Sequence, residues 1–415
     1  MLRKIGVVLG LALCSCGGGS GIGGTGVNGT VLSGANLIPE PGVTVLITDA
    51  NRVQTSVKTD ALGAFSVSGV ATPYSAAVVE TASQTATLYL GLTRNNPALI
   101  SDSGTSPNSN RQSTLAVTLS GGTYPQPAAN YTTNYLFVSP WAFQSDSLTG
   151  TLPAANSLTF SWLDTSSTTT SGTLWGLQVQ TDDSGLPTSY PGYGSTSATL
   201  TDAQTTTASL SLGSVTNALL TGTITPPPGY SVAEVDGLLI LSNGYNIEMF
   251  ADTTASTNLS YTTPSIPGTT LALSIIAFNA SGALWFPYAA GLAADATGVT
   301  FDCPGPPNLI APTDQQTGVP TSTPISWSAT PGAIYNVGFF INQSELLVWT
   351  ADTNLTIPDL SSVGFGPFPS TKVSWLVSAQ TGFTSIDAVT DPALPVATGL
   401  SCDAISAPQD FTTSG

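Results

Sequence analysis

The sequence predicts an all-β protein made of tandem antiparallel β-sandwich domains on a flexible tether. Apolar and polar residues alternate with a period of two along most of the chain, which is the pattern of half-buried strands. Clusters of Gly, Pro, Asn, Asp and Ser interrupt this alternation about every ten residues, as turns between strands do. No amphipathic helix is evident, and only 7% of the residues are charged, which excludes coiled coils and helical bundles.

The composition also excludes several classes of function. The chain of 415 residues has no histidine, so histidine-based catalytic triads and His-ligated zinc are ruled out. The net charge is −17, and no Lys or Arg lies between Arg111 and Lys372. Because nucleic acids and other anions need cationic partners, we expect no nucleic-acid binding. The sequence predicts no cofactor, no metal site and no catalytic residue.

The N-terminus is typical of a secreted bacterial lipoprotein. Residues 1–4 form a basic segment, because they include Arg3 and Lys4. The apolar residues 5–13 that follow are too few to span a bilayer as a helix. The run LCSC at residues 13–16 resembles the bacterial lipoprotein cleavage box, with small Ser15 before the lipidated Cys16. Cys14 fits less well because bulky Leu13 would precede it. An ordinary signal peptide that contains two cysteines is the alternative.

From this resemblance we expect residues 1–15 to be a signal peptide and residues 16–26 to be a Gly-rich tether. A lipid on Cys16 would make the membrane a partner of the protein. The expected location is the bacterial cell envelope, with the anchor in the outer membrane and the protein facing the periplasm or the cell surface.

The first sandwich is expected at residues 27–100. In the run TDALGAF at residues 59–65, Asp60 can bond its own turn, Gly63 can adopt a positive φ and Phe65 can fill the core. This element resembles the carboxypeptidase regulatory-like family, a small transthyretin-like sandwich. The family usually has a glycine where this chain has ATPY at residues 71–74. The resemblance implies no peptidase activity, because the catalytic zinc ligands of carboxypeptidases include histidine.

An internal similarity in the middle of the chain predicts a duplicated sandwich, which follows a polar linker at residues 101–113. The copies are expected at residues 114–215 and 216–303, because residues 119–140 resemble residues 220–242 in their order of strand, Pro-rich turn, Tyr and apolar strand. The alternative is a chance similarity between two low-complexity β segments.

The last sandwich is expected at residues 304–415. The runs TPISW at residues 323–327 and KVSWLVSA at residues 372–379 resemble a bacterial fibronectin type III domain. This immunoglobulin-like resemblance implies that Trp327, Tyr335 and Trp375 are core residues. Cys303 and Cys402 bracket this domain, and two cysteines in a secreted chain suggest a disulfide. In a simple sandwich the two chain ends lie at opposite poles, so the bond would require an extra strand or a returning tail.

Two groups of residues are candidates for ligand binding. Asp182 and Asp183 could belong to a Ca²⁺ loop, although a solvated hairpin turn is the better interpretation of DDSG. Trp141, Trp285 and Tyr288 lie near turns, where aromatic rings can form a flat platform for a sugar. Burial in a core is the favoured interpretation of these aromatic side chains.

The first functional hypothesis is a non-catalytic cell-surface lipoprotein that acts as a modular scaffold, spacer or adhesin. The second is a carbohydrate-binding lipoprotein, and the third is a hydrolase that uses carboxylates alone. A polysaccharide or another surface protein would be the partner. Because the chain has no histidine, its stability is expected to be nearly flat from about pH 6 to 8.

Overall fold

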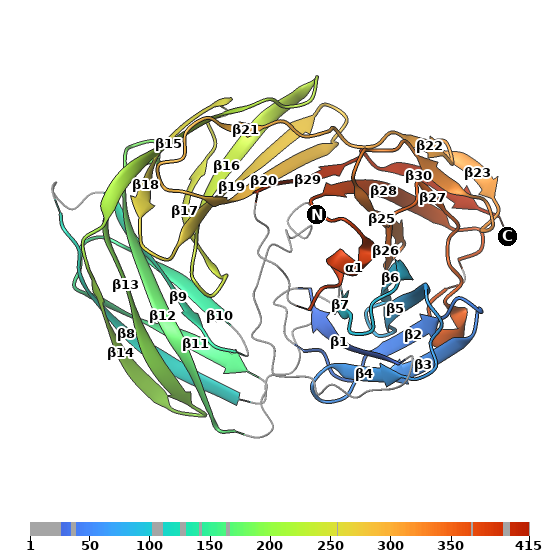
Figure 1. The fold of residues 1–415 in the computed structure, drawn as a ribbon, viewed down its shortest axis with the longest axis horizontal. Coiled ribbons are helices and arrows are strands. Elements are labelled where there is room, and N and C mark those ends of the chain that lie inside the picture. Colours follow the sequence, from blue (N-terminus) through green and yellow to red (C-terminus); the bar gives the residue numbers. More distant parts are fainter. Residues whose placement is uncertain are drawn as a thin grey trace.

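The computed structural model describes residues 26–34, 39–101, 111–124, 130–140, 143–162, 167–254, 256–366, 368–392 and 399–414. Strands dominate these ranges, so the all-β prediction is confirmed. The helices of the described residues are the short α1 (Ile386–Val389) and the 3-10 helix η2 (Ser361–Val363). In Figure 1 the strands form an arc that turns back on itself and brings the first and last units side by side.

The first unit is a seven-stranded sandwich. Its strands are β1 (Val27–Ser33), β2 (Thr44–Thr48), β3 (Gln54–Lys58), β4 (Ala64–Val67), β5 (Tyr74–Glu80), β6 (Thr85–Leu92) and β7 (Ala98–Ser101). One sheet has the order β4-β1-β7 and the other has the order β3-β2-β5-β6, with β1 and β7 parallel.

The turn before β4 has the structure that its residues predict. The Asp60 carboxylate accepts hydrogen bonds from the backbone N–H groups of Leu62 and Ala64, at 2.8 and 2.9 Å. Gly63 has a φ of +70°, and a Cβ there would lie 2.7 Å from the carbonyl oxygen of Val31. Phe65 is buried in the core of the first unit. Glycine is therefore required at this position for both its conformation and its close backbone contact.

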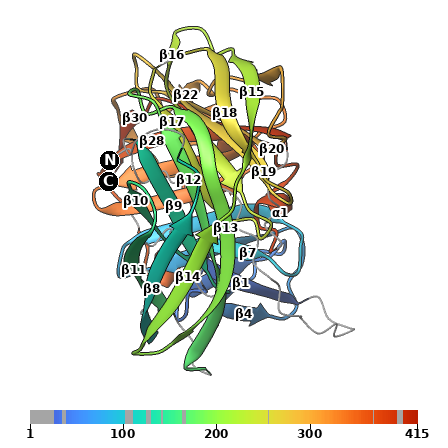
Figure 2. The same ribbon diagram turned by 90° about the vertical axis from the view of Figure 1, so that its left-hand side faces the viewer.

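The second unit has the same topology. Its strands are β8 (Arg111–Gly121), β9 (Tyr131–Val138), β10 (Phe143–Thr149), β11 (Ala154–Trp162), β12 (Thr169–Thr181), β13 (Pro187–Thr201) and β14 (Thr205–Leu212). They form the sheets β11-β8-β14 and β10-β9-β12-β13, with β8 and β14 parallel. Figure 2 shows β8, β13 and β14 on the face turned toward the viewer. The expected linker at residues 101–113 is shorter than predicted, because its two ends belong to β7 and β8.

The third unit repeats this order once more. Its strands are β15 (Thr216–Ile224), β16 (Tyr230–Ile240), β17 (Asn246–Asp252), β18 (Asn258–Ser265), β19 (Thr270–Asn279), β20 (Leu284–Leu292) and β21 (Val299–Phe301). They form the sheets β18-β15-β21 and β17-β16-β19-β20, with β15 and β21 parallel. The strand order of the two middle units is the same, as a duplication requires, and the first unit is a third copy of that topology.

The last unit is a two-sheet sandwich of different strand order. Its strands are β22 (Leu309–Ala311), β23 (Gln316–Val319), β24 (Ile325–Trp327), β25 (Ile334–Ile341), β26 (Ser344–Thr350), β27 (Asn354–Leu355), β28 (Lys372–Thr381), β29 (Gly399–Ile405) and β30 (Gln409–Thr413). One sheet is β22-β24-β27, and in the other β28 pairs with β25, β29 and β30. Trp327, Tyr335 and Trp375 are buried in its core, as the fibronectin resemblance implies.

The last unit joins the first and third units by direct strand pairing. Strand β26 pairs in parallel with β6, and β29 pairs antiparallel with β20. One sheet therefore continues through three units in the order β17-β16-β19-β20-β29-β28-β25-β26-β6-β5-β2-β3. Each of these pairings supplies hydrogen-bond partners that an isolated edge strand would lack. The tandem sandwiches are therefore joined by continuous backbone pairing.

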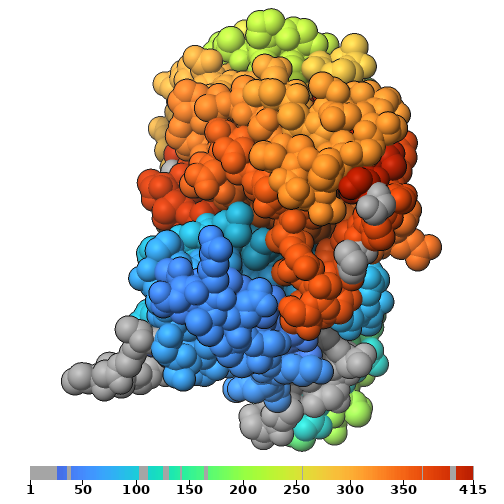
Figure 3. Space-filling model, turned by 90° about the vertical axis from the view of Figure 1, so that its right-hand side faces the viewer, coloured from blue at the N-terminus to red at the C-terminus, as the bar shows by residue number. Residues whose placement is uncertain are grey.

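The units also share their apolar cores. The first unit's sheet turns Val45 and Ile47 to its own core, whereas Leu46 and Leu88 lie in the same cluster as Trp375 of the last unit. Figure 3 shows the last unit seated directly on the first. The second and third units are joined in the same way, because Leu136 and Val138 lie in the core of the third unit. These sheets bury apolar residues on both faces, so the units do not have independent cores.

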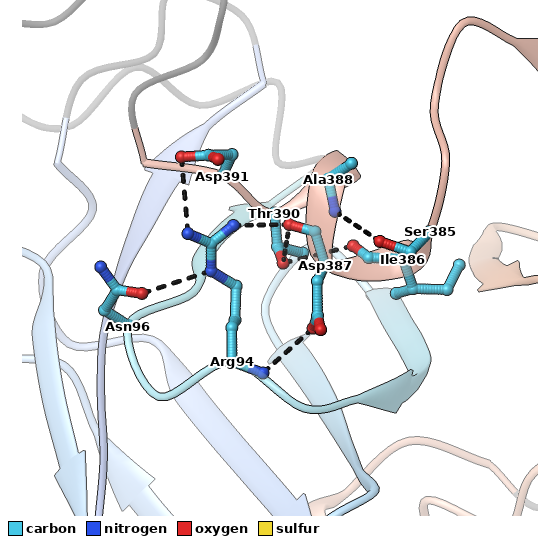
Figure 4. A network of polar contacts seen from close by, with 8 residues as sticks. All are labelled: Arg94, Asn96, Ser385, Ile386, Asp387, Ala388, Thr390 and Asp391. Carbon is cyan, nitrogen blue, oxygen red and sulfur yellow. Dashed lines mark hydrogen bonds and ion pairs between the residues drawn. The ribbon is translucent and has the colours of Figure 1, made fainter.

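Helix α1 forms a further joint between the last unit and the first (Figure 4). Ile386 is buried in the first unit's core. The Asp387 carboxylate accepts hydrogen bonds from the backbone N–H groups of Thr93 and Arg94, at 2.8 and 3.1 Å, and the Arg94 guanidinium forms an ion pair with Asp391 at 3.4 Å. Burial alone would raise the pKa of Asp387, but these hydrogen bonds and the nearby Arg94 hold it below its usual value.

Candidate functional site

The candidate site is an acidic hollow on the third unit, in the face of its sheet that points away from its core. The opposite face of this sheet packs on β15, β18 and β21, which lie on the outer side of the arc in Figure 1. It has a volume of about 390 Å³ and is lined by Glu234, Asp236, Leu238, Asn246, Glu248, Ala251, Ser274, Phe286 and Tyr288. A hollow of about 400 Å³ between the third and last units has no Asp, Glu, Lys or Arg in its lining.

The strand pairing explains why three carboxylates meet here. Glu234 and Asp236 are two residues apart on β16, so their side chains project from the same face of the sheet. Glu248 reaches that face from β17, where it lies opposite Leu238. Ser274 lies opposite Asp236 on β19, and its hydroxyl donates a hydrogen bond to the Asp236 carboxylate at 3.1 Å.

Burial and the neighbouring carboxylates change the acidity of Asp236. Burial raises the pKa of Asp236 to about 6, and the nearby charges of Glu234 and Glu248 act in the same direction. The hydrogen bond from Ser274 lowers the pKa but does not outweigh these effects. A carboxyl group with this pKa exchanges its proton close to neutral pH.

Two aromatic side chains form the opposite side of the hollow. Tyr288 lies opposite Ser274 on β20, and Phe286 is two residues away on the same face. Tyr288 is only 5% exposed, and burial raises the pKa of its hydroxyl to about 12. The hollow therefore places an apolar, aromatic surface next to a group of acids.

The acidic face continues into the last unit at the joint between β20 and β29. Asp403 lies opposite Phe286 on the same side of the sheet. Burial raises the pKa of Asp403 to about 6, although its carboxylate accepts hydrogen bonds from Ser378 and from Gln380, the latter at 3.3 Å.

The aromatic candidates from the sequence do not form one platform. Trp285 is fully buried in the core of the third unit, whereas Tyr288 projects from the opposite face into the hollow. The period of two along a strand separates them, because residues three apart point to opposite faces. This corrects the expectation that Trp285 and Tyr288 present a shared sugar-binding surface. Trp141 and the lipidation candidate Cys16 lie outside the described residues.

Cys303 and Cys402 form a disulfide with a Cα–Cα distance of 6.3 Å, within the usual range. Cys402 belongs to β29 and lies opposite Pro287 of β20. Strand β29 thus returns to the third unit and places Cys402 near Cys303, which follows β21. The disulfide links the third unit to the last unit at the seam where their sheets join.

The pair Asp182 and Asp183 belongs to a hairpin turn between β12 and β13. The Asp182 carboxylate accepts hydrogen bonds from the backbone N–H groups of Ser184 and Leu186, at 2.9 and 3.0 Å. Hydrogen bonds, first of all from Ser184, hold the pKa of Asp182 below its usual value. Asn279 makes the same contacts in the matching hairpin of the third unit. Asp182 and Asn279 therefore both have a structural role in their turns. Across the described ranges, no group of three or more His, Cys, Asp or Glu is arranged to hold a metal ion.

Sequence reasoning missed the hollow, although part of its signal is visible. The run AEVDGLLI of β16 has two acids on one face of an apolar strand, where an apolar or neutral residue is the usual choice. Glu248 could not be added without knowing the register of β17 on β16. The run WFPY at residues 285–288 supplies the aromatic side of the hollow, and the period of two divides its rings between two faces.

The raised pKa values predict that stability depends on pH. In the folded chain Asp236 and Asp403 titrate near pH 6 rather than near 3.8. Between about pH 4 and 6 the folded state therefore binds more protons than the unfolded state, and stability falls as pH rises through this window. We expect the midpoint of thermal unfolding to be several degrees higher at pH 5 than at pH 7. The nearly flat dependence of stability on pH that the sequence predicts therefore applies only above about pH 6.

The opposite effect is expected below about pH 4, because several aspartates have lowered pKa values and lose their stabilising charge there. They are Asp49, Asp182, Asp202, Asp252, Asp359, Asp387 and Asp410. Maximal stability should thus lie near pH 4–5. The double variant Asp236→Asn, Asp403→Asn should lose the slope between pH 5 and 7. Equal midpoints for the unaltered chain at pH 5 and 7 would contradict the assignment.

Comparisons with known proteins identify no family. No family model matches the chain, and no curated protein matches it. Among solved structures, the TIE protein of Bacillus anthracis is 7% identical with a TM-score of 0.16, and the match covers 66% of this chain and 49% of that one. A tetra-tandem repeat from the extending region of a large adhesion protein is 14% identical, also with a TM-score of 0.16, over 94% of this chain and 100% of that one.

The major pilin subunit BcpA of Bacillus cereus is 8% identical with a TM-score of 0.16, over 64% of this chain and 87% of its own. The chain thus spans about half the length of the TIE protein. Scores at this level are too low to transfer an arrangement of domains or a function. In the part of the chain that the structure describes, no helix has the length and hydrophobicity needed to cross a bilayer.

Proposed function

We propose that this chain is a non-catalytic, lipid-anchored protein of the bacterial cell envelope that serves as a rigid surface scaffold or adhesin. The observation that carries the proposal is the single sheet that continues through the first, last and third units. A protein that must hold a surface in one orientation benefits from joints that do not bend. A spacer built for reach would instead keep its units apart, whereas this chain folds back on itself.

Four kinds of contact support rigidity at the joints. Backbone pairing joins β26 to β6 and β29 to β20. The Cys303–Cys402 disulfide fastens the second of these joints, and α1 fastens the first by inserting Ile386 into the neighbouring core. Shared cores make relative movement of the units costly, because such movement would expose apolar surface. The composition supports a non-catalytic role, since the chain has no histidine for acid–base or nucleophilic catalysis.

The lipid anchor is tested by removing its attachment site. The Cys16→Ala variant is expected to leave the detergent phase in phase partitioning, because a chain without the lipid has no other expected anchor. The Cys14→Ala variant is the matched control and should remain in the detergent phase. A Cys16→Ala protein that stays wholly in the detergent phase would overturn the lipoprotein proposal.

Protease treatment of intact cells then tests the surface location. Loss of the protein from protease-treated, unlysed cells supports a surface scaffold or adhesin. Full protection in cells whose outer membrane is intact would instead restrict the protein to the periplasm and contradict a role in adhesion. The carbohydrate-binding alternative has little support in the described residues, because Trp285 is fully buried.

A further inference from the structure

We propose that the acidic hollow of the third unit binds an organic cation, namely the ammonium group of an alkylamine or the guanidinium group of an arginine side chain. The proposal is independent of the lipid anchor and of the scaffold role. It rests on three features of the hollow: its uncompensated negative charge, the hydroxyl of a largely buried tyrosine that lines it, and a size suited to a group larger than a single ion.

The negative charge in the hollow has no cationic partner among the described residues. Its lining contains Glu234, Asp236 and Glu248 but no Lys or Arg. The chain has only seven Lys and Arg in total, and Arg94, Arg111 and Lys372 already form ion pairs elsewhere.

The carboxylates in the hollow repel one another. The negative charge of Glu234 makes ionisation of Asp236 less favourable. A bound cation would reverse this repulsion, because an opposite charge within about 4–6 Å favours the ionised carboxylate.

The hydroxyl of Tyr288 is the second, independent feature. The side chain is 5% exposed and lines the hollow. Ser401 bonds the backbone carbonyl of Tyr288, but the hydroxyl itself has no hydrogen-bond partner among the described residues. Tyrosine hydroxyl groups in largely buried side chains usually have a hydrogen-bond partner. An N–H group of a ligand in the hollow would donate to this oxygen.

The aromatic rings and the size of the hollow favour an organic cation over a bare metal ion. Phe286 and Tyr288 lie on the same sheet face as the acids, on the other side of the hollow, and aromatic rings attract ammonium and guanidinium groups by cation–π interactions. The volume of about 390 Å³ exceeds what a single ion with oxygen ligands needs. Alkyl carbons next to the charged group would contact Leu238 and the aromatic rings, which line the same space.

The test is calorimetric titration of the full chain in detergent, at low salt and pH 7.5. The probes are spermidine, Nα-acetyl-arginine amide, Ca²⁺ and a neutral disaccharide. We expect saturable binding of the two organic cations, weakened at least about tenfold in Asp236→Asn and about threefold in Tyr288→Phe. The matched control is Asp183→Asn, which removes an exposed acid from a distant hairpin and should leave binding unchanged.

Each other outcome decides against the proposal. Saturable binding of Ca²⁺ alone would make the hollow a metal site, and binding of the disaccharide alone would make it a sugar site. Equal weakening by Asp183→Asn and Asp236→Asn would show only attraction to the overall negative charge. Absence of saturable binding by either cation would overturn the proposal. Binding is compared only between variants whose melting midpoints match that of the unaltered chain. If Asp236→Asn fails to fold, Tyr288→Phe still tests the proposal, because it removes the hydroxyl and retains the aromatic ring.

Discussion

Replacement of Trp327 by alanine is expected to destabilise the last unit by about 3–5 kcal/mol, the usual cost of emptying a large buried aromatic site. Trp327 is 2% exposed, and its ring centroid lies 5.5 Å from that of Tyr335 in an edge-to-face arrangement. The indole nitrogen has no hydrogen-bond partner among the described residues. The expected loss therefore comes from packing rather than from a polar contact.

The effect should extend to the first unit. The cluster around Trp327 includes Leu46 and Leu88 from the first unit's sheet, so a cavity there weakens the contact between the two units. Denaturant unfolding of the whole chain, followed by circular dichroism, measures the change. Phe278→Ala is the control, because this aromatic ring is 48% exposed and its loss should change stability by less than about 0.5 kcal/mol. An unchanged midpoint for Trp327→Ala would show that the indole is not a core residue.

Local features of the fold were predictable because their causes lie within a few residues. The turn at Asp60 and Gly63 requires a carboxylate that bonds its own backbone and a residue with positive φ, and both are visible in the sequence. The similarity of the two middle units could also be found, because hairpins such as those at Asp182 and Asn279 retain matching polar residues.

The membership of the first unit in this repeat was not predictable from these patterns. Its strand order is the same as that of the middle units, but a topology can be conserved while the side chains that fill it change. The inclusion of β29 in the third unit's sheet, which brings Cys402 to Cys303, was equally hidden.

The joints between units were missed for a different physical reason. Strand β26 pairs with β6 through backbone hydrogen bonds, and every residue except proline carries the groups that form them. Such pairing leaves little trace in side-chain chemistry. One trace exists in hindsight, since Leu46 and Val45 both need burial although they point to opposite faces of β2.

The acidic hollow could be predicted only in part from the sequence. Glu234 and Asp236 are neighbours on one strand face, which the period of two predicts. Their proximity to Glu248 and Tyr288 depends on the register of three strands. Register is set by long-range packing and hairpin geometry, so the complete site emerges only from the folded chain.

A second large effect is expected in backbone hydrogen exchange at the seam between β6 and β26. In an isolated first unit β6 would be an edge strand, with one row of amides open to solvent. In the arc, residues 85–89 pair with residues 345–349, and the sheet there carries apolar residues in the cores on both of its faces. We expect the amides of β6 to exchange only when the two units separate.

The measurement that tests the account most directly is therefore hydrogen exchange of the intact chain, read residue by residue on β6, β26 and β3. Strand β3 is the internal control, because it lies at the end of the same sheet, pairs only with β2 and is largely exposed. We expect the amides of β6 and β26 to exchange at least about a hundredfold more slowly than those of β3. Exchange of β6 at the rate of β3, with β5 still protected, would mean that the seam is open in solution and that the units are not one rigid body.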